Sequence, residues 1–178
     1  FGSKIVSFLM VPLYTGIIAS EDYGAVNLMT TLASLLMPIL LLSIQDAILR
    51  FALDKDYSKE DVISTATRII IIGNLVLFIA ISVLYFAKLT TIPTPYFVYL
   101  FTYFLFSSFG NAFTLYLKGK NKSSVVAISG IINTLFTCLV NVITLVFLKL
   151  GITGYMIGNV TGSFLNLLVL FVGGAIYK

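Results

Sequence analysis

The sequence predicts an all-α integral membrane protein, a bundle of six transmembrane helices, from its composition and from the lengths of its apolar runs. Apolar residues make up 59% of the 178-residue chain and charged residues only 10%, whereas a soluble chain carries about 25% charged residues. A soluble domain of this size has too little interior for so much apolar surface. Runs such as residues 69–72, four consecutive isoleucines, lack the alternation of a transmembrane barrel. Soluble enzymes and nucleic-acid-binding domains are therefore excluded.

Six apolar segments are long enough to span a membrane, because a helix needs about 20 residues to cross the hydrocarbon core. Polar and turn residues divide the chain into segments at residues 1–19, 23–49, 66–87, 96–117, 125–148 and 153–177. The chain opens inside the first segment and has no initiator methionine. We therefore expect residues 1–178 to be part of a longer polypeptide.

The connections between these segments are short, with one exception. An acidic turn ends at Asp22, which we expect to cap the second helix. Residues 118–122 and 149–152 predict tight turns before the fifth and sixth helices. The long connection, before the third segment, contains Ser-Lys-Glu-Asp at 58–61, which fits a capping box. This motif predicts that the third helix begins in water, before its apolar part.

Basic residues in the connections set the orientation that we expect in the membrane. With the N-terminus inside, most of the 11 Lys and Arg residues fall on the cytoplasmic side. Both ends of the chain are then cytoplasmic, and the net charge of +4 reflects topology rather than nucleic-acid binding. The outside pair is Lys88 and Lys149; the inside set is Lys4, Arg50, Lys55, Lys59, Arg68, Lys118, Lys120, Lys122 and Lys178.

Polar side chains recur at helical spacing on four of the six segments. In hydrocarbon such residues normally turn toward other helices or toward a wet cavity. Two interpretations stay open, namely hydrogen bonds between helices and a hydrated pathway that several helices share. The stripes are Asn27, Thr31 and Ser34, continued by Pro38 and Gln45; Ser107, Asn111 and Thr114; Asn133, Thr137, Asn141 and Thr144; and Asn159, Ser163 and Asn166.

Two prolines and three glycines mark places where helices bend or pack closely. Pro12 and Pro38 lie near the middle of the first and second segments, and each removes a backbone donor. They predict either static bends or a pair of hinges. Gly154, Gly158 and Gly162 recur every four residues on the sixth segment, a pattern typical of close helix packing.

Asp46 and Arg50 are an acid–base pair on the second segment, four residues apart with the acid first. This order favours an ion pair that anchors the helix end, and its distance from the start of the helix places it near the cytoplasmic interface. The alternative is an anion-recognition point, since a guanidinium fork suits phosphate oxygens.

Catalysis, cofactors and metals receive no support from the sequence. The chain has no histidine and one cysteine, Cys138, inside an apolar run. Asp46 is the only carboxylate on any span, whereas acid–base or nucleophilic catalysis needs several partnered groups. We therefore expect no enzymatic activity, no cofactor and no metal site.

Several short pieces of the sequence resemble one family of transporters, in order and in spacing. They are Leu-Met-Val-Pro-Leu-Tyr-Thr at 9–15, Ser-Glu-Asp-Tyr-Gly at 20–24, Ala-Ile-Leu-Arg-Phe at 47–51, Leu-Lys-Gly-Lys at 117–120 and Leu-Gly-Ile-Thr-Gly-Tyr-Met-Ile-Gly at 150–158. Together they resemble the polysaccharide-biosynthesis transporters, the oligosaccharide-flippase branch of the multidrug/oligosaccharidyl-lipid/polysaccharide exporter superfamily.

This resemblance implies a multi-pass protein of the cytoplasmic membrane with twelve or more helices in two lobes, of which this chain is the N-terminal one. The implied cargo is a polyprenyl-diphosphate-linked oligosaccharide, moved outward by alternating access for O-antigen, capsule or exopolysaccharide synthesis. The implied partners are the lipid bilayer, the C-terminal lobe and the polysaccharide polymerase machinery. For the diphosphate we expect Arg50 first and Lys4 second. For sugar hydroxyls we expect Asn27, Asn111, Asn133 and Asn141.

Three alternatives remain. A cation-coupled multidrug extruder of the same superfamily would place an acid deep in the lobe, where Asp46 does not lie. A peptidoglycan-precursor flippase would carry arginines on the first span, which has only Lys4. A non-transporting membrane scaffold would use the polar stripes for assembly alone, so that they stay dry and paired.

Overall fold

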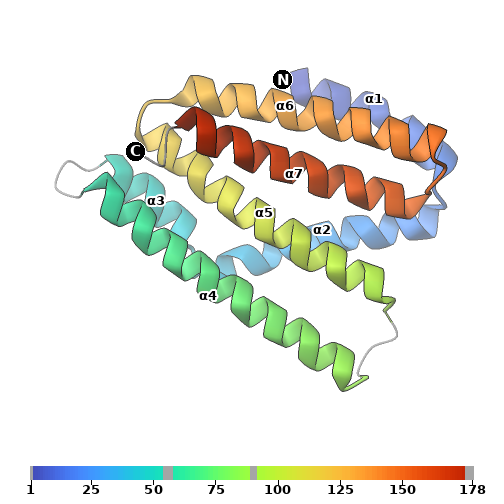
Figure 1. The fold of residues 1–178 in the computed structure, drawn as a ribbon, viewed down its shortest axis with the longest axis horizontal. Helices are drawn as coiled ribbons and strands as arrows, with labels where there is room; N and C mark the ends of the chain where they lie inside the picture. The colour runs from blue at the N-terminus through green and yellow to red at the C-terminus, as the bar shows by residue number, and fades with distance from the viewer. Residues whose placement is uncertain (1, 54–57, 89–91, 175–178) are drawn as a thin grey trace.

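The computed structural model describes residues 2–53, 58–88 and 92–174, and within these ranges all regular secondary structure is helical (Figure 1). The single π-helical turn, η1, continues α6. The elements are α1 (Gly2–Ile17), α2 (Ser20–Leu40), α3 (Ile44–Leu53), α4 (Lys59–Phe86), α5 (Thr94–Gly119), α6 (Ser123–Val142), η1 (Ile143–Phe147) and α7 (Ile152–Gly174).

Helix α5 is the centre of the bundle. It contacts α7 and α6 on one side and α2, α3 and α4 on the other (Figure 1). Helix α1 packs mainly on α6, so α1, α6 and α7 form one group and α2, α3 and α4 a second. The core between them is apolar, with Phe104, Leu41 and Leu170 completely buried. One polar contact joins α4 to α5, where Asn74 donates to Ser108 Oγ over 3.1 Å.

The prediction of a single helix over residues 23–49 is wrong. The structure breaks it into α2 and α3, because Leu42 and Ser43 both adopt left-handed backbone conformations, with φ of 51° and 52°. Pro38 lies just before the break, and its carbonyl accepts the Ser43 N–H at 2.9 Å, so the helix ends with a tight turn instead of continuing. Sequence periodicity does not detect such a break, since the residues on both sides are apolar.

The break is packed against α4 at Gly73. A Cβ atom at this position would lie 2.7 Å from the Leu40 carbonyl oxygen, so only glycine lets α4 approach the end of α2 this closely. The contact fixes the end of α2 before the chain turns into α3.

Five helices are long and apolar enough to cross a membrane, namely α2, α4, α5, α6 together with η1, and α7. Six spans were expected. Helix α1, which corresponds to the first, is shorter, with 16 residues, whereas a span needs roughly 17–25. The chain is therefore a multi-pass membrane protein, and the described helices supply five candidate spans and one shorter apolar helix.

The expected helix starts are confirmed at one place and wrong at another. Ser58 caps α4, since its side chain accepts the Asp61 N–H at 3.1 Å. At the start of α2, however, the N-cap residue is Ala19, and Asp22 lies within the first turn. Asp22 instead accepts a hydrogen bond from the Tyr96 hydroxyl at 3.2 Å and so ties α2 to α5. The expected turns at 118–122 and 149–152 both separate helices.

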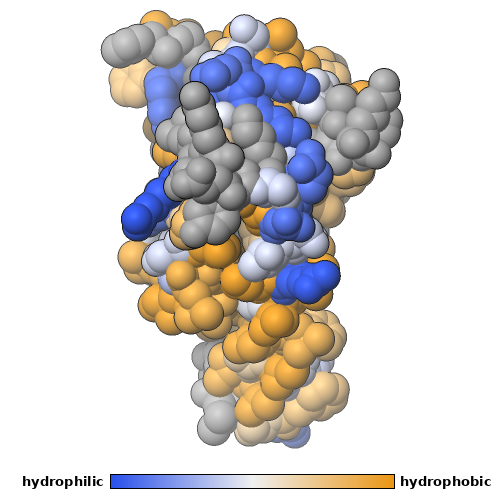
Figure 2. Space-filling model, turned by 90° about the vertical axis from the view of Figure 1, so that its left-hand side faces the viewer, coloured by the Kyte–Doolittle hydropathy of each residue, from blue (hydrophilic) through white to orange (hydrophobic). Residues whose placement is uncertain are grey.

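The surface divides into a hydrophilic end and apolar sides. Figure 2 looks at the end of the bundle that carries the α5–α6 connection, where hydrophilic side chains gather above an apolar flank. Lys118, Lys120 and Lys122 belong to this connection, and Lys122 Nζ donates to the Gly174 carbonyl at the end of α7 over 2.9 Å. On α4 the apolar side chains Ile72 and Phe78 are exposed, as expected of a surface that faces lipid.

Candidate functional site

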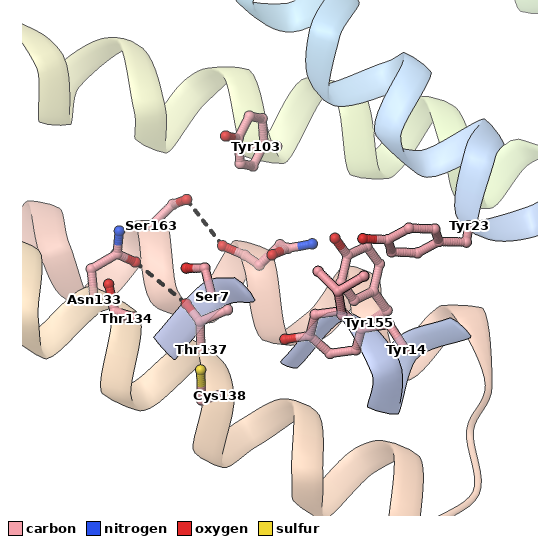
Figure 3. Close-up of a pocket in the computed structure, with 12 residues that line it drawn as sticks. Ser7, Tyr14, Tyr23, Tyr103, Asn133, Thr134, Thr137, Cys138, Tyr155 and Ser163 are labelled. Atoms are coloured by element: carbon pink, nitrogen blue, oxygen red, sulfur yellow. Dashed lines mark hydrogen bonds between the residues drawn. The ribbon is translucent and has the colours of Figure 1, made fainter. Parts of the chain in front are cut away.

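Two adjoining cavities open between the two groups of helices, with volumes of about 340 and 430 Å³. They share Tyr103 on α5, Asn133 on α6 and Ser163 on α7, so together they form one continuous wall. The first is lined by Ser7, Val11, Tyr14, Tyr23, Tyr103, Asn133, Thr134, Thr137, Cys138, Tyr155, Asn159 and Ser163 (Figure 3). The second is lined by Ser34, Met37, Pro38, Gln45, Tyr103, Phe106, Ser107, Asn111, Asn133, Ser163 and Asn166.

Both cavities are polar without being charged. Their linings, among the residues that the structure describes, contain amides, hydroxyls and one thiol but no Asp, Glu, Lys or Arg. The amides and hydroxyls can donate and accept hydrogen bonds, and they lie inside a bundle whose outer surface is apolar. This arrangement suits a ligand rich in neutral hydrogen-bonding groups more than one that carries a net charge.

Three tyrosines close one end of the first cavity. Tyr14 on α1 meets Tyr155 on α7 edge to face, with ring centroids 4.9 Å apart, and Tyr23 on α2 lies 5.4 Å from Tyr155 (Figure 3). Tyr14 is further fixed by Asn141 on α6, whose Nδ2 donates to the Tyr14 hydroxyl at 2.8 Å. The end that they close carries the α1–α2 connection, which the distribution of basic residues predicts to face outward.

The seam between α6 and α7 is dry and tight. A Cβ atom on Gly158 would overlap Asn141 Oδ1, and one on Gly162 would overlap Thr137 Oγ1. One on Gly154 would lie 2.9 Å from Thr144 Oγ1. Asn141 is fully buried, and its Oδ1 has no hydrogen-bond partner among the described residues. Its close approach to Gly158 is of the kind made by weak Cα–H···O contacts between helices.

The asparagines expected to face the substrate fall into two groups. Asn133 and Asn111 line the cavities, and Asn133 contributes to both. Asn141 lies in the α6–α7 seam and Asn27 is exposed on α2; neither is among the lining residues of these cavities. The stripe on α6 therefore has an open end at Asn133, which borders the cavities, and a closed end at Asn141, which is buried between helices.

The charged candidates lie outside the cavities. Arg50 and Asp46 are exposed on α3, and within the described ranges no ion pair joins them. The Arg50 guanidinium lies 5.9 Å from the centre of the Phe51 ring instead. Lys4 is exposed near the start of α1, three residues before the cavity-lining Ser7, and so lies on the same helical face one turn beyond it.

The two prolines differ in their surroundings. Pro38 lines the second cavity three residues before the break between α2 and α3. Pro12 is exposed within α1, which the structure assigns as one uninterrupted helix. Only the second segment thus combines a proline with a change of backbone direction.

Comparison with known proteins adds a family to this geometry. The family model described as polysaccharide biosynthesis protein matches residues 1–177. The chain belongs to this family. The resemblance inferred from the short motifs is therefore confirmed, over nearly the whole chain. No significant match was found among the curated proteins or among the solved structures.

The polar stripes predicted from the sequence of this polysaccharide biosynthesis protein did not include the tyrosines that line the cavities. Tyr103 lies four residues before Ser107 and eight before Asn111, so it extends the α5 stripe by one turn. Tyr155 lies four residues before Asn159 on α7 and extends that stripe in the same way. Extending each polar stripe to include tyrosine, which has an apolar body and a polar tip, would have found both residues.

Proposed function

We propose that this chain is the N-terminal lobe of a transporter that moves polyprenyl-diphosphate-linked oligosaccharides from the cytoplasmic to the outer face of the membrane by alternating access. Family membership supports a role in making surface polysaccharide. The observation that carries the proposal is the continuous uncharged wall, to which α1, α2, α3, α5, α6 and α7 all contribute. A glycan presents many hydroxyls and needs such a wall to cross an apolar environment.

The same wall argues against a cation-coupled multidrug extruder. A coupling site for protons or cations needs a carboxylate within the lobe. No described carboxylate lines either cavity, and the two nearest in sequence lie elsewhere, Asp46 exposed on α3 and Asp22 bonded to Tyr96. A peptidoglycan-precursor flippase shares the hydroxyl-rich cargo and remains the second candidate.

A non-transporting scaffold is a weaker explanation of the polar residues. A scaffold would pair its polar side chains across helix contacts, as Asn141 does with Tyr14. Asn133 and Ser163 instead border open volume, as does Asn111, whose Nδ2 also donates to Met37 Sδ on α2 over 3.5 Å. Polar groups of this kind in the membrane typically mark a substrate pathway.

At the cytoplasmic mouth we propose that Arg50, followed by Lys4, contacts the diphosphate. Both side chains are exposed and lie outside the uncharged wall. The cargo would then be recognised in two parts, with its charge at the mouth and its sugars along the cavities.

Deletion of the full-length gene in its host tests the proposal. We expect surface polysaccharide to be lost and intact lipid-linked repeat units to accumulate on the cytoplasmic face, and a plasmid-borne wild-type copy to restore export. Complementation with Arg50→Ala should restore membrane insertion but little polymer. Unchanged polysaccharide in the deletion strain, with new drug sensitivity, would overturn the flippase in favour of the extruder. Normal export by both Arg50→Ala and Arg50→Lys would refute the role of Arg50 alone.

A further inference from the structure

We infer that Tyr103 is the stacking surface of a sugar-ring subsite, at the point where the two cavities join. The inference rests on the proposed function, and it assigns to one aromatic side chain a role in recognising the glycan. Tyr103 lines both cavities, together with Asn133 and Ser163. A cargo that passes from one cavity to the other must pass this ring.

The ring of Tyr103 is held in place by a neighbouring tyrosine on the same helix. Tyr99, one turn earlier on α5, stacks on it with ring centroids 5.7 Å apart and an interplanar angle of 28°. Tyr99 is itself buried, and its hydroxyl shares a hydrogen bond of 2.9 Å with Thr30 on α2. One side of the Tyr103 ring is thus supported by a fixed neighbour, while the residue borders open volume. In Figure 3 the ring projects from α5 toward α7, on the side of Ser163.

Hydrogen-bonding groups surround this ring, from α5 itself and from the facing helices α6 and α7. The side chains of Ser107 and Asn166 have no protein partner within the described part of the chain. Asn133 Oδ1 accepts from Thr137 Oγ1 at 3.4 Å, which leaves the Asn133 amide N–H groups available to a ligand. Ser163 donates to the Asn159 carbonyl at 3.0 Å, and its oxygen can still accept.

These features together match a pyranose ring better than other neutral ligands. A pyranose has an apolar face of C–H groups and a rim of hydroxyls. The apolar face can lie on an aromatic ring, and the rim needs amides and hydroxyls around it. The absence of charged side chains among the described lining residues disfavours a uronic acid or a phosphorylated sugar at this point. The ligand class is therefore an uncharged hexose or N-acetylhexosamine of the lipid-linked glycan.

Binding measurements on the purified full-length protein in nanodiscs test this subsite. The two probes are undecaprenyl diphosphate carrying a neutral disaccharide and undecaprenyl diphosphate without sugar. Tyr103→Leu should raise the Kd for the disaccharide probe about tenfold and leave the Kd for the sugar-free probe unchanged. Tyr103→Phe and Tyr103→Trp, which keep an aromatic ring, should stay within about twofold of wild type for both probes. Tyr85→Leu, an exposed tyrosine on α4, is the matched control and should change neither Kd.

The outcomes separate this inference from the proposed function. If Tyr103→Leu binds the disaccharide probe as wild type does, or weakens both probes equally, the stacking role is overturned while the flippase proposal stands. If the wild-type protein binds neither probe, the proposed function fails, and the subsite fails with it. Should Tyr103→Leu not fold, Tyr103→Met keeps an apolar side chain of similar length and serves the same comparison.

Discussion

The two ends of the polar stripe on α6 have the same residue types and opposite surroundings. Asn133 and Thr137 border a cavity, whereas Asn141 and Thr144 are buried against α7. The difference does not come from α7, whose glycines face both ends: Gly162 lies against Thr137 and Asn133, and Gly158 and Gly154 lie against Asn141 and Thr144. Asn141 is also covered by Tyr14 on α1, to which it donates a hydrogen bond. Neither the spacing nor a facing glycine therefore distinguishes an open cavity wall from a closed seam; at Asn141 the packing of Tyr14 from α1 closes the contact.

The largest effect on stability should come from filling the dry seam. Gly158→Ala places a Cβ atom on Asn141 Oδ1, and Asn141 is fully buried and hydrogen-bonded to Tyr14, so it can move aside only by giving up that bond. We expect a loss of about 3 kcal/mol and a lower folded yield, and Gly158→Leu should lose more. Folded yield and thermal unfolding of the purified protein measure this.

A matched glycine on α6 provides the control. A Cβ on Gly130 would meet nothing within 4 Å, so Gly130→Ala should be neutral or stabilise by up to about 1 kcal/mol. Adding Asn141→Ala to Gly158→Ala should recover part of the lost stability, because it removes the atoms that overlap. Wild-type stability of Gly158→Ala alone would contradict the tight seam.

A smaller loss is expected from breaking the contact between α6 and α1. Asn141→Ala removes the hydrogen bond to Tyr14 and leaves a buried hydroxyl without its partner, at a cost of about 2 kcal/mol. Tyr14→Phe should cost about 1 kcal/mol. A double-mutant cycle on thermal unfolding should give a coupling of about 1 kcal/mol between the two positions; additive losses would show that the bond contributes nothing to stability.

A substitution to glycine at the break between α2 and α3 should raise the stability of the protein, whereas the substitutions in the α6–α7 seam lower it. Leu42 is 79% exposed and has a φ of 51°, a conformation that costs a side-chain-bearing residue roughly 1–2 kcal/mol. Leu42→Gly removes this cost and adds some chain entropy to the unfolded state, so we expect a gain between zero and about 1 kcal/mol. Leu35→Gly, exposed inside α2, should instead lose about 1 kcal/mol. Equal losses in both variants would argue against strain at the break.

The smallest effect on stability is expected at the end of the α6 stripe that borders the cavities, where function should suffer instead. Asn133→Ala should change the free energy of unfolding by less than about 0.5 kcal/mol, because its side chain borders a cavity. Transport of a lipid-linked disaccharide in proteoliposomes should fall, while Ile131→Ala, exposed on the same helix, should transport normally. Loss of stability with normal transport would reverse the comparison between Asn133 and Asn141.

The sequence predicted where the helices lie along the chain better than how they pack against one another. Apolar runs and turn residues located five of the seven described α-helices separately and merged α2 with α3, because membrane spans carry long and unmistakable patterns. The second span failed, since the Leu42–Ser43 turn is made of backbone dihedrals that no residue type there demands. Only part of the candidate site could be predicted from the sequence. Asn111 and Asn133 follow from spacing, but the burial of Asn141 depends on how α1 and α7 pack against it, which the spacing does not show.

The contact between Asn141 and Gly158 has a consequence for how sequences with this fold can change. The two positions share one fixed volume, so neither can grow unless the other shrinks. A chain with alanine or serine at 158 should carry a small residue at 141, and the asparagine should be tolerated only opposite glycine. Exchange at these sites is therefore expected to occur in pairs, and an alignment of the family should reveal it as covariation across the α6–α7 seam.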